Sequence, residues 1–215
     1  EAALTDVTGK PFRHNEQSLR VVDKLEHDGA GLNLTYEVRM AILGHTGDFI
    51  PETLEGQVVR ASDRIAYINH DIDDAMRAGI LKESDIPREI ADILGHSHSE
   101  RINTLVMDMI DHTAETGTLG MRPEVAAAMD ELRKFMFDKV YFAPSTNAEK
   151  GKACHIVEYL YKYFIGSPEK MPELYVGFAK EYGLERAVCD FISGMTDDFA
   201  VDYFKELCIP KSWSY

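Results

Sequence analysis

Cysteine is scarce in this sequence of 215 residues, and no hydrophobic run is long enough to cross a bilayer. The three cysteines, Cys154, Cys189 and Cys208, are scattered and odd in number, and none lies in a CxxC pair. This pattern argues against a disulfide scaffold, disfavours a metal site built from thiolates and fits the reducing cytoplasm. Because the sequence also lacks a secretory signal, we expect a cytoplasmic protein without a membrane partner.

Basic side chains are also few, with 23 Lys and Arg against 37 Asp and Glu, so the net charge is −14. Such a surface repels the phosphodiester backbone, and nucleic acid is not expected as a constitutive partner. A small anionic substrate is still compatible, because a basic pocket or a metal ion can outweigh the overall charge locally. The sequence contains no P-loop, GxGxxG or GxSxG motif, which disfavours phosphate binding by a Walker-type loop.

Alternation of apolar and polar residues at period two is absent as well, whereas apolar residues recur at a spacing of three to four. The sequence therefore predicts an all-α fold, with helices punctuated by Gly and Pro. The expected helices follow the apolar stripe of Leu19, Val22 and Leu25 and then cover residues 33–43, 54–81, 84–94, 99–115, 123–140, 147–165, 171–182 and 183–206.

The helix expected over residues 54–81 has two different faces at about 100° per residue. Five apolar residues share the side that should pack inward: Val58, Ala61, Ile65, Ile68 and Ile72. The opposite side gathers acidic and polar residues: Asp63, Tyr67, His70, Asp71 and Asp74, with Arg64 at its edge. Like charges on one stripe repel, so a divalent cation, an arginine or a substrate hydroxyl could offset them. A solvated acidic face is the alternative, although Tyr67 in the middle of the stripe disfavours it.

The spacing of Asp63, Arg64, Tyr67 and Asp71 resembles the last motif of the HD-superfamily deoxyguanosinetriphosphate triphosphohydrolase-like family. The resemblance implies that Asp63 is the fourth metal ligand and that Arg64 contacts the α-phosphate side of the nucleotide. It further implies that Tyr67 packs on the deoxyribose and that Asp71 binds the 3′-hydroxyl. These roles suit the side chains, because carboxylates are hard metal ligands and the arginine fork matches phosphate oxygens.

A second match lies near the start, where PFRHNEQSLRVVDKLE (residues 11–26) resembles the family segment that follows the HD motif. His14 takes the position of a histidine that points at the triphosphate, although a lone histidine is as often structural. Glu1 matches the carboxylate of a His–carboxylate pair that assists the attacking water in this family. The resemblance continues through residues 31–47 and 187–213 and covers almost the whole chain.

The family builds its metal site from four ligands in the order His, His-Asp and Asp, and the first three have no counterpart here. The His-Asp dipeptides at 27–28 and 70–71 match neither the position nor the context of the missing pair. The chain also starts without Met, so we expect a piece of a longer protein, inactive alone, whose Mg²⁺ or Mn²⁺ site is incomplete. We expect residues 1–215 to form a single all-helical region. In it, residues 1–81 are the remainder of an HD-type catalytic core, and residues 82–215 are the helical C-terminal part of the same domain.

Other chemically suggestive residues have ordinary explanations. His96 and His98 could suggest a metal site, but their spacing and the Gly-Ser context favour a solvent-exposed loop. Tyr141 falls where the family places residues near the nucleotide, and the sequence does not assign it a role. The aromatic run from Tyr159 to Phe164 is typical of a core or a subunit interface.

The resemblance thus implies a metal-dependent hydrolase that converts a deoxynucleoside triphosphate, dGTP or dNTPs in general, to deoxynucleoside and triphosphate. The family resemblance implies a homo-oligomer. One alternative is another HD-type phosphohydrolase, either a nucleoside monophosphatase or a cyclic-nucleotide phosphodiesterase. The other alternative is a non-catalytic helical module for regulation or assembly.

Overall fold

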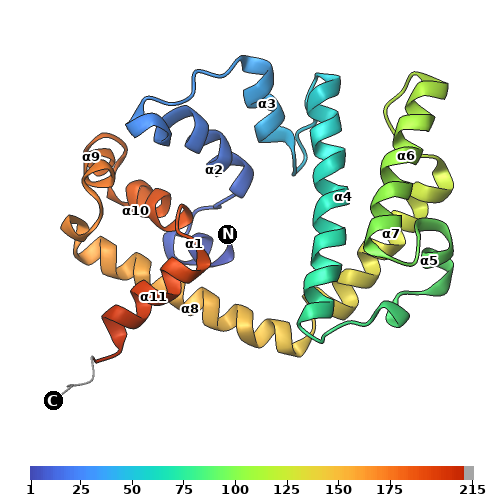
Figure 1. The fold of residues 1–215 in the computed structure, drawn as a ribbon. Coiled ribbons are helices and arrows are strands. Elements are labelled where there is room, and N and C mark those ends of the chain that lie inside the picture. Colours follow the sequence, from blue (N-terminus) through green and yellow to red (C-terminus); the bar gives the residue numbers. More distant parts are fainter. Residues whose placement is uncertain (211–215) are drawn as a thin grey trace. The chain divides into compact units, whose positions relative to one another are not determined.

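The computed structural model describes residues 1–210, which contain eleven α-helices and no strand (Figure 1). The all-α prediction is therefore confirmed, while residues 211–213, the end of the last family-like segment, lie outside the described part. The α-helices are α1 (Ala2–Thr8), α2 (His14–Arg20), α3 (Tyr36–Gly44), α4 (Leu54–Arg77), α5 (Arg88–Leu94), α6 (His98–Thr116), α7 (Pro123–Met136), α8 (Pro144–Gly166), α9 (Glu173–Tyr182), α10 (Leu184–Ser193) and α11 (Asp197–Cys208). The short helical segments are η1 (Val21–Leu25), η2 (His27–Gly29), η3 (Glu83–Asp85), η4 (Phe137–Tyr141) and η5 (Pro168–Lys170), of which η1 and η4 are π-helices.

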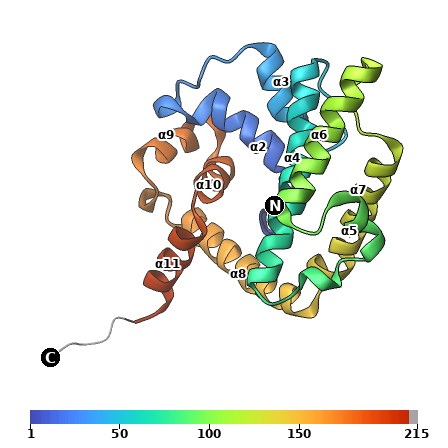
Figure 2. The ribbon, with the colours of Figure 1, turned by 45° about the vertical axis from the view of Figure 1, so that its right-hand side comes forward.

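The chain forms two compact units, each with a hydrophobic core of its own. The terminal unit combines Glu1–Leu34 with the chain from Ala148 onward, and the central unit is Thr35–Asn147. In the terminal unit, the blue helices α1 and α2 lie with the orange and red helices α8 to α11 (Figures 1 and 2). Residue 81 is no boundary between these units, because Leu81 is buried in the core of the central unit.

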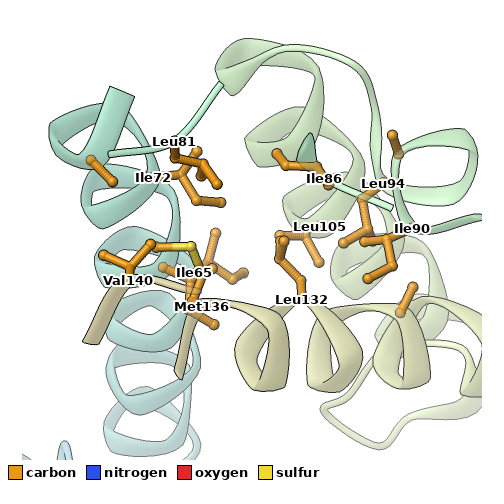
Figure 3. Packing of buried hydrophobic residues seen from close by; sticks show 14 of the residues in the cluster. Ile65, Ile72, Leu81, Ile86, Ile90, Leu94, Leu105, Leu132, Met136 and Val140 are labelled. Atoms are coloured by element: carbon orange, nitrogen blue, oxygen red, sulfur yellow. The ribbon is translucent and has the colours of Figure 1, made fainter. Parts of the chain in front are cut away.

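The core of the central unit is built by α4, α5, α6, α7 and η4, whose buried aliphatic side chains converge in Figure 3. From α4, the predicted inward residues Ile65, Ile68 and Ile72 are all buried, and Ala61 packs at the margin. The prediction for Val58 is wrong, because its side chain is 43% exposed. The first turns of α4 pack instead on the side of Gly56, where an added Cβ would lie 2.6 Å from Pro51 Cβ.

Local capping explains where α4 begins and ends. The Thr53 side chain accepts a hydrogen bond from the Gly56 backbone N–H at 3.2 Å, which starts the helix at the predicted residue. The helix ends at Arg77 rather than at residue 81, because Gly79 adopts a left-handed conformation with φ of 71°.

Capping also corrects two other predicted helices. The helix expected from residue 33 begins at Tyr36, since Thr35 is its cap and Asn33 has a positive φ. The prediction of one helix over residues 183–206 is wrong, because Thr196 caps a new helix and accepts a hydrogen bond from the Phe199 N–H. The helix α1 was not predicted from the sequence.

The terminal unit has an aromatic-rich core. Tyr161 and Phe164 of α8 are buried in it, which confirms the core interpretation of the aromatic run. The same unit encloses one carboxylate completely, that of Asp190 on α10. Arg20 donates to it from Nε at 2.9 Å and from Nη2 at 2.7 Å, and Arg186 donates from Nε at 3.0 Å and from Nη2 at 2.9 Å. No helix in residues 1–210 is both long enough and apolar enough to span a membrane.

Candidate functional site

The polar face of α4 presents the family-like residues in a line along the helix. Asp63, Tyr67 and Asp71 are spaced by four residues, which places their side chains on one face. All three are partly buried, whereas Arg64 is exposed to solvent. Tyr67 packs against the margin of the hydrophobic core, so its ring is held in place and does not lie on a fully solvated surface.

The structure adds Tyr141 to this face. Its hydroxyl donates a hydrogen bond to Oδ2 of Asp71, across 70 residues of sequence. Burial, the hydrogen bond to Asp71 and its negative charge together raise the pKa of Tyr141, so the phenol stays protonated and remains a donor at neutral pH. Within residues 1–210, Oδ1 of Asp71 accepts no hydrogen bond, which leaves this oxygen available to a ligand hydroxyl.

Tyr141 reaches α4 because the backbone changes its winding just before it. The regular helix α7 ends at Met136, and η4 continues as a π-helix from Phe137 to Tyr141. Single π-turns are frequent at functional sites, since the extra residue per turn redirects a side chain. The Tyr141 ring lies edge-on against Phe137 at 5.0 Å between centroids, and Arg133 Cζ lies 5.5 Å from the Phe137 ring. The position of Tyr141 within the family resemblance was the one signal for it in the sequence.

Glu1 and His14, which the resemblance implicated separately, contact each other in the terminal unit. His14 Nδ1 lies 2.7 Å from Glu1 Oε1, and the His14 backbone N–H donates to the same oxygen. Burial opposes ionisation of Glu1, but the His14 backbone and imidazole outweigh it and hold the pKa of this carboxyl below its usual range. Both side chains line a cavity of about 370 Å³, together with Gln17. A carboxylate on Nδ1 fixes the orientation and protonation pattern of the imidazole.

Potential metal ligands are dispersed over the described part of the chain, residues 1–210. No three His, Cys, Asp or Glu side chains in this part are arranged to hold a metal ion. Asp63 is the one ligand that the family resemblance assigns here, and a divalent ion requires several protein ligands. Any metal bound at Asp63 therefore needs ligands from outside the described residues.

His96 and His98 belong to no group of three potential metal ligands in the described part of the chain. The expectation of a solvent loop is wrong for His98, which is the first residue of α6. Its Nδ1 contacts Asp73 of α4, and its ring lies edge-on to His70 with 5.5 Å between centroids. His96 is exposed and lies 3.2 Å from Asp92.

Comparison with known proteins gives consistent results. A family model described as a phosphohydrolase-associated domain matches residues 119–206. A deoxyguanosinetriphosphate triphosphohydrolase-like protein of Caldanaerobacter subterraneus is 47% identical over 99% of this chain and 63% of its own length. Proteins of the same name from Clostridium perfringens and Clostridium tetani are 46% and 44% identical over 100% and 98% of the chain. The chain spans 66% and 64% of the length of these two relatives.

Proposed function

Because the chain belongs to the deoxyguanosinetriphosphate triphosphohydrolase-like family of phosphohydrolases, we propose that it supplies substrate-binding and catalytic residues for hydrolysis of deoxynucleoside triphosphates to deoxynucleoside and triphosphate. The chain spans 63% to 66% of the length of these relatives. The proposal therefore concerns a protein of the relatives' length that contains this chain, the full-length protein. We further propose that the full-length protein binds a divalent ion such as Mg²⁺ or Mn²⁺, forms a homo-oligomer and is cytoplasmic.

The contact between Tyr141 and Asp71 beside Tyr67 is the observation that carries the proposal. The two rings and one carboxylate form a partly buried surface that suits a sugar. The Tyr67 ring would pack on the deoxyribose, and the unoccupied Oδ1 of Asp71 would accept a hydrogen bond from the 3′-hydroxyl. A site built to bind a hydroxyl discriminates strongly against an analogue that lacks it, because its buried polar groups are then left unpaired. Arg64, exposed at the edge of this face, would contact phosphate oxygens.

Glu1 and His14 are assigned the proton transfer in this proposal. Glu1 holds the imidazole through Nδ1, and His14 accepts the proton of the attacking water or stabilises phosphate charge. We expect Glu1→Gln to lower kcat by about 10- to 100-fold, at the lower end of general acid–base contributions because the imidazole itself remains. Rapid-quench measurement of the chemical step checks this. An unchanged rate constant would remove the pair from the reaction.

The first test measures the products of the full-length protein with Mg²⁺ or Mn²⁺ and each of the four dNTPs. Anion-exchange chromatography separates triphosphate from pyrophosphate and orthophosphate. Triphosphate as the product would support the proposal, and the substrate series would give the base preference. Pyrophosphate or orthophosphate would instead assign the protein to another group of phosphohydrolases. Absence of both turnover and dNTP binding would favour a non-catalytic helical module.

Substitution of Tyr141 by phenylalanine tests the sugar contact. The change removes one hydrogen bond to a carboxylate, and bonds to charged groups contribute about 1.5–3 kcal/mol. Asp71 then loses its orientation, so we expect KM for dNTPs to rise about tenfold. Steady-state kinetics with a dNTP and with its 2′,3′-dideoxy analogue distinguish loss of the sugar contact from a general loss of activity. The analogue lacks the hydroxyl that Asp71 would bind, so its KM should change less. Tyr36→Phe on the exposed side of α3 is the matched control. An equal loss for both nucleotides would contradict the assignment.

A further inference from the structure

The terminal unit contains a second cavity of about 370 Å³, distinct from the one lined by Glu1 and His14. Its walls come from the connection between α1 and α2 and from the junction of α9 with α10. The apolar part of the lining includes Phe12 and Leu184, and Tyr182 adds an aromatic ring. Phe12 is shared with the first cavity. A volume above about 300 Å³ with mostly apolar walls is typical of small-molecule sites.

A positively charged cluster lies at this cavity, whereas the chain as a whole is acidic. Arg186 lines it, and this guanidinium shares the single carboxylate of Asp190 with Arg20. No other carboxylate in residues 1–210 forms an ion pair with either arginine, so the three groups together carry one excess positive charge. Lys10 and Glu185 also line the cavity and neutralise each other at 2.9 Å. The cluster is therefore net positive, in a chain whose net charge is −14.

The geometry of Arg186 leaves a donor for a ligand. Its Nε and Nη2 atoms are occupied by Asp190, and Nη2 also contacts Gln17. In the described part of the chain Nη1 makes no hydrogen bond. The Arg186 guanidinium also lies over the Phe12 ring, with Cζ 5.9 Å from the centroid. A cationic donor beside an aromatic wall suits a molecule that has both an anionic group and a flat apolar part.

We propose that this cavity binds a small organic phosphate whose apolar part packs between Phe12 and Leu184 and whose phosphate contacts Arg186 and Lys10. The phosphate offsets the excess charge of the cluster, and Lys10, which is 75% exposed, can turn from Glu185 to the ligand. The site does not depend on the hydrolytic reaction proposed above. Phenyl phosphate is the simplest probe that combines the two features.

The test is calorimetric titration of the full-length protein with phenyl phosphate. Lys10→Gln removes one positive charge and should weaken binding about fivefold, whereas Glu185→Gln removes the competing carboxylate and should strengthen it about fivefold. Both residues are exposed, so these variants are expected to fold. Lys205→Gln removes a comparable surface lysine, paired with Asp202 in α11, and should change nothing. His14→Ala alters the other cavity and should leave the affinity unchanged.

Opposite effects of Lys10→Gln and Glu185→Gln, with neither control changing the affinity, would support the site. Absence of saturable binding, or equal weakening by Lys205→Gln, would overturn it. Two further ligands test the chemistry of the proposal. Inorganic phosphate binding as tightly as phenyl phosphate would overturn the role of the apolar wall, and phenol binding as tightly would overturn the role of the charge.

Discussion

The Asp63→Asn substitution is expected to lower the rate of triphosphate release by the full-length protein at least about 1,000-fold. The family resemblance assigns Asp63 to the metal, and a neutral amide is a much weaker ligand than a carboxylate for a hard divalent ion. The structure is compatible with a metal ion bound to the Asp63 carboxylate. The Asp63 side chain is partly buried on the polar face of α4, and none of the described residues forms a hydrogen bond or ion pair with it.

Because Asp63 has no partner among the described residues, its substitution should change activity without changing stability. Because Asp63→Asn breaks no contact, we expect the free energy of unfolding to change by less than about 0.5 kcal/mol. Asp74→Asn is the matched control, since Asp74 lies on the same helix, is 71% exposed and pairs with Arg77 at 3.1 Å. The product assay and a urea titration of both variants check the prediction. Activity of Asp63→Asn within tenfold of the parent, or an equal loss in Asp74→Asn, would refute the metal assignment.

Replacement of Asp190 by alanine is expected to destabilise the terminal unit by about 3–5 kcal/mol, the usual effect of removing one partner from a buried ion pair. Asp190 is fully buried, and its carboxylate accepts hydrogen bonds from Arg20, Arg186 and Gln17. Without it, two guanidinium groups remain beside a hydrophobic core with no carboxylate to neutralise them. The expected loss is a large fraction of the stability of a typical domain.

Urea unfolding followed by circular dichroism measures this loss. The control is Asp202→Ala, which removes a 74% exposed carboxylate from an ion pair with Lys205 in the same unit. Exposed pairs of this kind contribute at most about 1 kcal/mol. If Asp190→Ala lowered the free energy of unfolding by no more than Asp202→Ala does, the buried cluster would not stabilise the unit. The excess charge inferred for the neighbouring cavity would then also need revision.

The periodicity of the sequence predicted the helical class and one face of the site, but it missed α1 and the break between α10 and α11. The apolar spacing of Ile65, Ile68 and Ile72 predicts both a helix and its buried side, because this spacing brings one apolar side chain to the core at each turn. The same argument failed at Val58, where the first turns of α4 pack on a different side. Periodicity reports the average direction of burial and does not reveal which neighbour covers each end of a long helix.

Local spacing and matching residues were enough to establish the all-α class, the family and the positions of Asp63, Arg64, Tyr67 and Asp71 along one helix. Contacts between distant residues were decided by the tertiary structure alone. Tyr141 meets Asp71 after a π-turn that follows α7, and the buried carboxylate of Asp190 accepts hydrogen bonds from Arg20, which lies 170 residues away in the sequence. Such pairs leave no local pattern, because their energy depends on burial and on partners that folding brings together.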